Sequence, residues 1–394
     1  MQPVKIAILG NYWDSQIYSG RLYLFKLDGS LTIIDWDRLI AEFPIEDELK
    51  IALECAFKNS EYFYGQNFKR FFADKEVKNV VEKKFIKLGD KELVLNEKDI
   101  YKYVISEKNN PLPFPHSDVT LYKNHIYSSS RDGLYCTTIG KKLKYGFNRN
   151  IKKKWDAPAI SISALYKSLA IAAGDEGLFE LKIDNSYWEI GSNLKDPVRL
   201  HSKNAIACDW NYYSIYSSSH IGGGALASYR KYSSDILDYG RELECIIDES
   251  KIFNNRGYSW GSRDKLCLAK SGEVHIVRYK PWLERIEEKL EHLGVVKISG
   301  WKGDVVSGAI GLFGSIIECD NCIIIATTDG SIYNFPGEPV RWRVFTRSKY
   351  YTNHLHIIYD DGLTIYSFNH DYFVDQNQKM LGVKHCNLQF KKQP

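Results

Sequence analysis

The chain has 394 residues, of which 44% are hydrophobic and 14% aromatic, and its formal net charge is +4. This charge is small for a chain of this length, so bulk charge does not point to nucleic-acid binding, and any basic contact must come from a local patch. No apolar run reaches the ~18 residues of a membrane span, and residues 1–13 lack a signal-peptide pattern. Eight scattered cysteines do not form the framework of a disulfide-rich secreted domain. We therefore expect a cytoplasmic protein that makes no membrane contact.

A unit of three short strands recurs along the chain. Its first copy is 15–37, with turns at Gly20 and Gly29, nine positions apart. Copies with the same separation follow in chain order at Asn124 and Gly133, Ser168 and Gly177, Asn321 and Gly330, and Asn353 and Gly362. Asn and Gly suit such turns because they tolerate positive φ. Looser copies at 202–230 and 261–279 raise the number to seven. From Gly133 to Gly362 the mean period is roughly 46 residues, near the ~40–45 of a propeller blade.

The segments between the copies supply fourth strands. The clearest are 187–190, 242–249, 295–301 and 340–345, which are short, β-branched or aromatic stretches. Four antiparallel strands repeated seven times predict an all-β fold, a seven-bladed β-propeller. A strand from one terminus should complete the blade at the other. Residues 4–9 and 383–390 both qualify, and the sequence does not choose between them.

Two helical insertions interrupt the repeat. The larger, 38–110, follows the third strand of the first copy, and its first helix is indicated by a stripe of Leu49, Leu53 and Phe57. A second helical segment is expected within 68–84, then a hairpin about Gly89-Asp90 and a helix capped by Asn96. The smaller insertion predicts a helix over 282–293, in blade five. The predicted domains are a propeller, 1–37 with 111–394, and an α-rich insertion, 38–110.

The repeated unit resembles the WD-repeat. Asp-Gly turns at Asp28-Gly29, Asp132-Gly133, Asp329-Gly330 and Asp361-Gly362 occupy the position of the family's second turn. Trp36-Asp37 ends the third strand of the first copy, as the family pattern expects. The resemblance implies propeller architecture and a role as an interaction platform. It identifies no particular family, so no functional residue is carried over.

Three motifs with catalytic or metal-binding spacing have simpler structural interpretations. Residues 257–261 match G-x-S-x-G, but no helix follows Ser259 as a nucleophile elbow requires, so we expect a blade turn. Cys319 and Cys322 should lie opposite each other across a two-residue hairpin, and His354 and His356 should share one face of a strand. Strand packing accounts for both pairs, and we predict no catalytic residue, metal ligand or cofactor.

The glycines at 308, 311 and 314 form a G-x-x-G-x-x-G pattern. A phosphate-binding loop would continue into Lys-Ser/Thr and a helix, and neither follows here. We therefore expect an inter-blade loop.

The most suggestive surface feature is the basic segment 141–155, in which seven basic residues are interleaved with aromatic ones. Such a pattern suits a nucleic-acid backbone or an acidic protein partner, although it also suits a solvated surface. Arg341 and Arg343 add charge on the predicted strand 340–345, which we expect at the exposed edge of blade six. The candidate partner-binding residues are Lys141, Lys142, Lys144, Arg149, Lys152, Lys153, Lys154, Trp155, Arg341 and Arg343.

Three functional hypotheses follow. The leading one is a non-catalytic propeller that serves as a protein-interaction platform or a subunit of a larger complex, with the insertions placed to contact a partner. The second is a subunit that binds nucleic acid or an acidic partner through 141–155. The third is an enzyme whose site lies in the central channel of the propeller.

Overall fold

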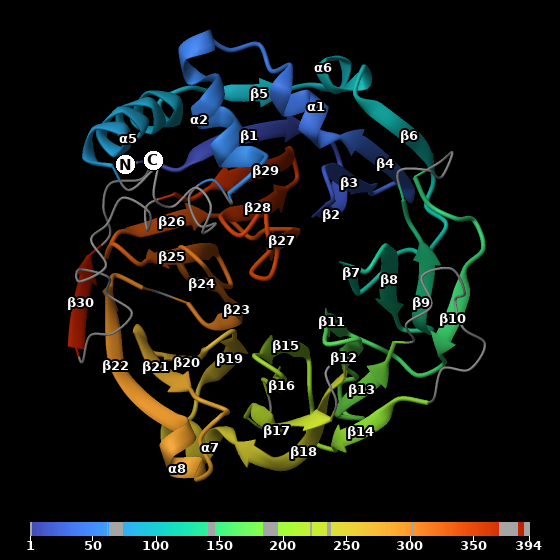
Figure 1. The fold of residues 1–394 in the computed structure, drawn as a ribbon, viewed down its shortest axis with the longest axis vertical. Coiled ribbons are helices and arrows are strands. Elements are labelled where there is room, and N and C mark those ends of the chain that lie inside the picture. Colours follow the sequence, from blue (N-terminus) through green and yellow to red (C-terminus); the bar gives the residue numbers. More distant parts are fainter. Residues whose placement is uncertain are drawn as a thin grey trace. The chain divides into compact units, whose positions relative to one another are not determined.

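The computed structural model describes residues 2–60, 62, 74–140, 146–183, 196–220, 223–234, 238–301, 303–369 and 385–389. The chain forms two compact units. The first contains 1–110, 310–381 and 389–394, and the second contains 111–309 and 382–388. The described strands form seven sheets, each with four antiparallel strands, and two of these sheets carry a fifth strand (Figure 1). This is a seven-bladed β-propeller, and the predicted fold class is confirmed.

Three sheets belong wholly or mainly to the first unit. One contains β2 (Tyr12–Tyr18), β3 (Arg21–Lys26), β4 (Ser30–Asp35) and β6 (Val104–Asn109). Another contains β27 (Arg341–Val344), β28 (His354–Tyr359), β29 (Gly362–Ser367), β1 (Val4–Leu9) and β5 (Leu93–Leu95). The third contains β23 (Val305–Gly311), β24 (Gly314–Cys319), β25 (Cys322–Thr327) and β26 (Ile332–Pro336).

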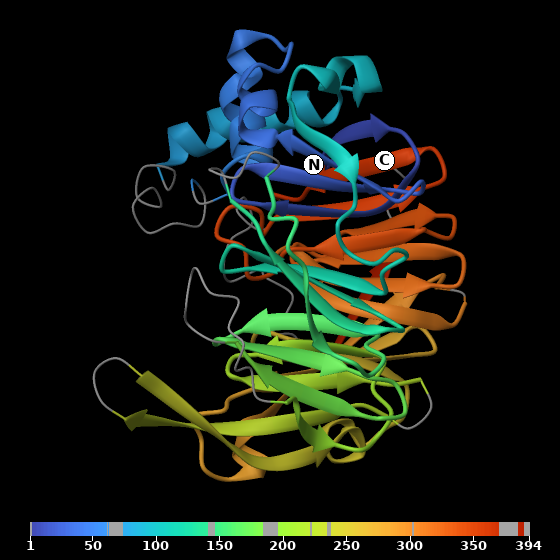
Figure 2. The same cartoon turned by 90° about the vertical axis from the view of Figure 1, so that its right-hand side faces the viewer.

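The second unit contributes four sheets. The first contains β7 (Asp118–Tyr122), β8 (His125–Ser130), β9 (Gly133–Thr138) and β10 (Lys152–Trp155), and the second contains β11 (Ser161–Leu165), β12 (Ser168–Ala172), β13 (Leu178–Lys182) and β14 (Val198–His201). The third contains β15 (Ala207–Asn211), β16 (Ser214–Ser218), β17 (Ala225–Ser234) and β18 (Asp238–Asp248), whose β17–β18 hairpin projects past the other strands (Figure 2). The fourth contains β19 (Tyr258–Ser262), β20 (Lys265–Lys270), β21 (Glu273–Tyr279), β22 (Leu290–Ser299) and β30 (His385–Gln389).

The predicted turns join the strands of these sheets where the backbone needs positive φ. Lys123 and Asn124 have φ of 46° and 61° between β7 and β8, as a two-residue hairpin turn requires. The N-terminal strand completes the last sheet, because β1 pairs antiparallel with β29 from Val4 to Leu9. The C-terminal strand β30 instead lies beside β22. The sequence left open whether 4–9 or 383–390 completes the last blade, and the structure shows that it is 4–9.

The segment after β4 contributes helices and two strands to the first unit. Its described helices are α1 (Trp36–Ala41), α2 (Asp47–Phe57), α5 (Lys75–Gly89) and α6 (Glu97–Tyr101), and α2 and α5 lie side by side (Figure 1). α2 buries Leu49, Leu53 and Phe57 in the same hydrophobic cluster as the β1 and β3 side chains. Trp36 lies in this cluster and donates its indole N–H to the Phe57 carbonyl at 2.7 Å. Residues 38–110 therefore share a core with the blades.

Two expected local structures were wrong. The segment 281–294 has only one helical turn, α8 (Ile286–Lys289), because Leu290 onward pairs with β21 as strand β22. Likewise, no hairpin forms about Gly89-Asp90, because α5 continues to Gly89 and the following β5 pairs in parallel with β1. In both segments pairing with another strand, the preceding β21 or the distant β1, overrides the local pattern. The remaining described helix, α7 (Glu249–Phe253), follows β18 directly.

The strand order of the β23–β26 sheet differs from the prediction. The turns at Asn321 and Gly330 join its second, third and fourth strands, because β23 precedes them in the sheet. Consequently 340–345 does not form a fourth strand at the edge of this blade, and β27 pairs with β28 as the first strand of the next sheet. Gly308 and Gly311 lie on β23 and Gly314 begins β24, so they do not form an inter-blade loop. The turns between all antiparallel strands of a blade use the same residue types. The nine-residue spacing of Asn321 and Gly330 therefore could not show which two of the three turns of the blade they occupy.

Candidate functional site

The basic segment divides between described and undescribed residues. Lys141, Lys142 and Lys144 lie outside the described residues. Arg149 is exposed before β10, and Lys152 and Lys153 are exposed on β10, the edge strand of its sheet.

Three residues at the end of the segment, Lys153, Lys154 and Trp155, also make contacts within the fold. Lys153 pairs with Asp156 at 2.7 Å, and its ammonium lies 5.6 Å from the centre of the Tyr135 ring. Trp155 packs against Phe179 with ring centroids 4.9 Å apart, and burial lowers the pKa of Lys154. Of the described basic residues of this segment, Arg149, Lys152 and Lys153 are exposed and Lys154 is half-buried.

Arg341 and Arg343 face a buried carboxylate and lie away from the basic segment in the sequence. Arg343 donates Nε–H and Nη2–H to the two oxygens of Asp14, each at 2.5 Å, and Asp14 is fully buried. Arg341 lies 3.8 Å from the same carboxylate and 5.4 Å from the Trp13 ring centre. This bidentate pair joins β27 to β2 and neutralises a charge that would be costly to bury alone.

The serine of the G-x-S-x-G motif is buried in a hydrogen-bond network. Ser259 lies within strand β19, not at a blade turn, where its hydroxyl donates to the Glu249 carboxylate and accepts from the Tyr216 hydroxyl at 2.7 Å. It is fully buried, so a substrate cannot reach it. This network accounts for the G-x-S-x-G match without nucleophilic chemistry.

The paired cysteines and histidines occupy strands. Cys319 and Cys322 are directly opposite across the predicted hairpin, and a hydrogen bond from the Cys319 thiol lowers the pKa of Cys322. His354 Nε2 lies 3.0 Å from the Ala56 carbonyl oxygen, and His356 Nδ1 lies 2.9 Å from Ser15 Oγ. Burial lowers the pKa of His354 to about 4. Among the described residues no group of three or more His, Cys, Asp or Glu side chains is placed to hold a metal ion.

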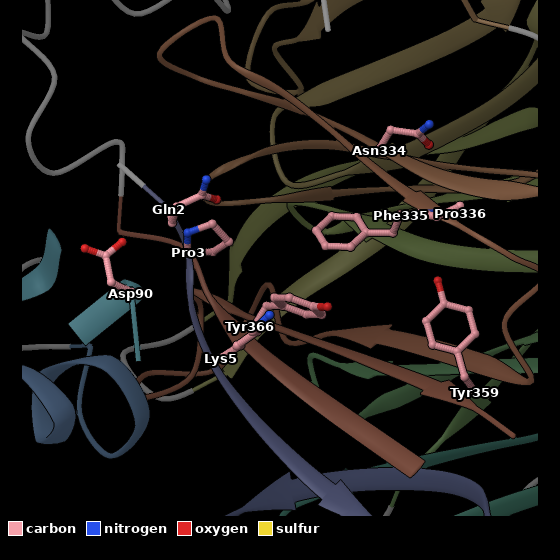
Figure 3. Close-up of a pocket in the computed structure, with 10 residues that line it drawn as sticks. Gln2, Pro3, Lys5, Asp90, Asn334, Phe335, Pro336, Tyr359 and Tyr366 are labelled. Atoms are coloured by element: carbon pink, nitrogen blue, oxygen red, sulfur yellow. The ribbon is translucent and has the colours of Figure 1, made fainter. Parts of the chain in front are cut away.

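One pocket of the first unit has an aromatic lining and a volume of about 470 Å³. Figure 3 shows the Phe335 and Tyr366 rings close together, and their centroids are 4.8 Å apart. Tyr359 and Lys5 also line the pocket. The hydroxyl of Tyr359 and Oδ1 of Asn334 are buried without a hydrogen-bond partner in the described part of the chain. Because these two polar atoms are buried, they offer a ligand in the pocket little accessible surface.

A larger groove of about 820 Å³ is built by the insertion, the first blade, and the end of β1 with the connection that follows it. We call it the α6 groove. It is lined by Leu9 at the end of β1, the β1–β2 connection, the β3–β4 turn with Leu27 and Asp28, helix α6, and the β6 residues Val104 and Glu107. β1 belongs to the last sheet and the β3–β4 turn to the first blade, whereas α6 and β6 come from 38–110.

Local hydrogen bonds hold both sides of the α6 groove in place. Asp28 Oδ1 accepts the Ser30 N–H at 2.8 Å, and Gly29 adopts φ of 80°, so the β3–β4 turn is fixed. Asn96 caps α6 by accepting the N–H groups of Lys98 and Asp99 at 2.9 and 3.2 Å. The Asp99 carboxylate completes the capping box by accepting the Asn96 N–H at 2.9 Å.

The α6 groove exposes large apolar side chains between these fixed edges. Leu9 is 46% exposed, Leu27 50% and Tyr101 74%. Leu24 and Ile100 also line the groove and are buried. Tyr12 donates its hydroxyl to the Leu9 carbonyl at 3.1 Å, and burial raises the pKa of Tyr12 to about 12, so it stays neutral.

Charged side chains line the same groove. The Lys26 ammonium lies 3.4 Å from Glu97 and forms a shorter ion pair with Glu107. The hydrogen bond from Lys26 lowers the pKa of Glu107. Glu97 remains 79% exposed and keeps free acceptor capacity, because its contact with Lys26 is long. Sequence reasoning missed this site, since Leu27 and Tyr101 are far apart in the chain and each resembles an ordinary surface residue.

No family model matches this chain, and no curated protein matches it. The chain is similar to a solved structure of the computationally designed Ika8 protein, with 10% identity, a TM-score of 0.39 and coverage of 93% of this chain and 100% of that one. The WD40 β-propeller domain of Doa1 is 11% identical, with a TM-score of 0.35 and coverage of 66% and 95%. Hsv2 of Kluyveromyces lactis is 10% identical, with a TM-score of 0.41 and coverage of 67% and 78%. These similarities carry no inference about function.

No helix in the described residues has the length and apolarity needed to cross a membrane.

Proposed function

We propose that this protein is a non-catalytic β-propeller that serves as a protein-interaction platform or complex subunit in the cytoplasm, with 38–110 as its α-rich, partner-contacting insertion. One observation carries the proposal. The insertion, the first blade and the end of β1 build the α6 groove, whose lining includes the exposed side chains of Leu9, Leu27 and Tyr101. Clustered apolar side chains rimmed by charge are a usual mark of a protein-interaction site.

Deleting 38–110 would not test this proposal, because it removes β6, which pairs with β4 from Ser30 to Ile34. Point variants in the groove are the appropriate test. The double variant Leu27→Ser/Tyr101→Ser removes two exposed side chains whose loss opens no cavity. A matched control, Ile51→Ser/Val80→Ser, changes two insertion side chains of similar exposure, 54% and 53%, that do not line the α6 groove.

Affinity capture from cells, quantified by mass spectrometry, would compare the two double variants with the unchanged protein. We expect the groove variant to lose its specific partners and the control to keep them. Equal recovery with both variants would contradict a role of the α6 groove.

A second candidate function is supported by the edge position of β10. We propose that Arg149, Lys152 and Lys153 form a contact surface for nucleic acid or an acidic partner. Their exposure on and next to an edge strand supports this proposal. Positive charge on an edge strand also prevents pairing between sheets, so binding must be measured directly.

A further inference from the structure

The α6 groove combines an apolar floor with an excess of acidic groups. Its charged lining residues are Lys26, Asp28, Glu97, Lys98 and Glu107. Lys26 is already held by Glu97 and Glu107, so its charge is largely satisfied within the groove. An anionic ligand would meet three carboxylates and only one further cation, Lys98. A cationic ligand would meet Glu97, whose carboxylate is 79% exposed.

The apolar surface selects the rest of the ligand. Leu9 and Leu27 flank the blade side of the groove and Tyr101 ends α6 on the other side. A ligand that covers them must carry large apolar groups, because burying such surface is the main favourable term in association. The volume of about 820 Å³ lies within the ~300–1,000 Å³ of small-molecule pockets, so the groove has room for only a few side chains of a partner protein.

We infer that the α6 groove binds a short peptide segment of a partner protein that carries a Lys or Arg beside one or two large apolar side chains. This inference rests on the proposed function and adds the chemistry of the partner. The apolar side chains cover Leu9, Leu27 and Tyr101. The basic side chain pairs with Glu97 and draws it away from its long contact with Lys26, which keeps Glu107 as its partner. The capped helix and the fixed turn preorganise both sides, which lowers the entropic cost of binding.

The test uses the full chain and a phage-displayed library of short random peptides. Peptides are selected on the unchanged protein and counter-selected on Leu27→Ser/Tyr101→Ser, so that only groove-dependent binders are kept. We expect the enriched peptides to share a Lys or Arg next to aliphatic or aromatic residues. Enrichment of neutral or acidic peptides would overturn the inference and leave the groove as a binding site. Absence of any groove-dependent peptide would overturn both the inference and the proposed groove.

A charge exchange then tests the predicted pair. For a synthetic enriched peptide, Glu97→Lys should raise Kd about tenfold, whereas Glu92→Lys, an exposed carboxylate outside the groove, should leave it unchanged. Replacing the basic residue of the peptide with Glu should restore binding to Glu97→Lys. Affinity for the unchanged protein should fall as salt rises. An equal Kd for the unchanged protein and Glu97→Lys would overturn the assignment of Glu97.

Discussion

The first unit contains two kinds of charged cluster, and they differ in what surrounds them. Asp14 and Arg343 are held face to face between β2 and β27, and Asp14 has no exposed surface. In the α6 groove, Lys26 lies between two carboxylates, one of which is mostly exposed. The buried pair is part of the scaffold, because either charge would be costly without the other. The exposed cluster can exchange partners at little cost, as a recognition surface requires.

The largest expected effect comes from breaking the buried pair. Asp14→Ala leaves Arg343 and Arg341 without their carboxylate, so the free energy of unfolding should fall by about 3 kcal/mol. Denaturant unfolding measures this loss. The double variant Asp14→Leu/Arg343→Met removes both charges and should recover part of it. A double variant less stable than Asp14→Ala would contradict the role of the unpaired charge.

The next largest effect is a loss of folding stability at acidic pH. Burial holds the pKa of His354 at about 4 in the folded protein, against ~6.5 in the unfolded chain. Between these values the unfolded state binds a proton that the folded state does not, so stability falls as pH falls from ~6.5 to about 4. The slope from this one group is at most ~1.4 kcal/mol per pH unit. Above ~6.5 its contribution is constant.

His354→Gln keeps a donor for the Ala56 carbonyl but removes the titrating group. Its free energy of unfolding should vary less between neutral pH and pH ~4.5 than that of the unchanged protein. Parallel pH profiles of the two proteins would contradict this origin of the acid sensitivity.

In contrast to the buried pair, substitutions in the α6 groove should affect partner binding and leave folding stability nearly unchanged. Leu27→Ser/Tyr101→Ser changes side chains that are 50% and 74% exposed, so the free energy of unfolding should change by less than ~0.5 kcal/mol at each site. The same variant should lose partner binding. Thermal unfolding monitored by circular dichroism separates these outcomes, and a large loss of stability would show that the groove is part of the scaffold.

The smallest expected effect is on the second candidate surface. Lys152→Glu/Lys153→Glu reverses two exposed charges on β10 and should leave the unfolding transition nearly unchanged. If β10 binds nucleic acid, the unchanged protein binds an unstructured RNA with an affinity that falls with salt, and the variant does not. Fluorescence anisotropy measures this binding. Absent or salt-independent binding removes the candidate.

Much of the fold was readable from local chemistry. Lys123-Asn124 has the positive φ expected of a hairpin turn, and Cys319 and Cys322 pair across Asp320-Asn321 as predicted. These features depend on a few adjacent residues, so they can be predicted from the sequence alone. By contrast, the expected helix over 282–293 and the hairpin about Gly89-Asp90 were wrong, because strand pairing overrides the local pattern: Leu290 onward pairs with the preceding strand β21, and β5 pairs with the distant strand β1.

By itself the sequence determined the repeated hairpins, their number and hence the propeller class. Tertiary structure decided the position of each hairpin within its blade. It also decided that β1 and not β30 completes the last sheet, and that Arg343 pairs with Asp14. It also brought Leu27 and Tyr101 to one groove, although they are separated by most of the insertion. The physical reason is that turns depend on neighbouring residues, whereas strand pairing, charge burial and grooves depend on contacts that only the folded chain creates.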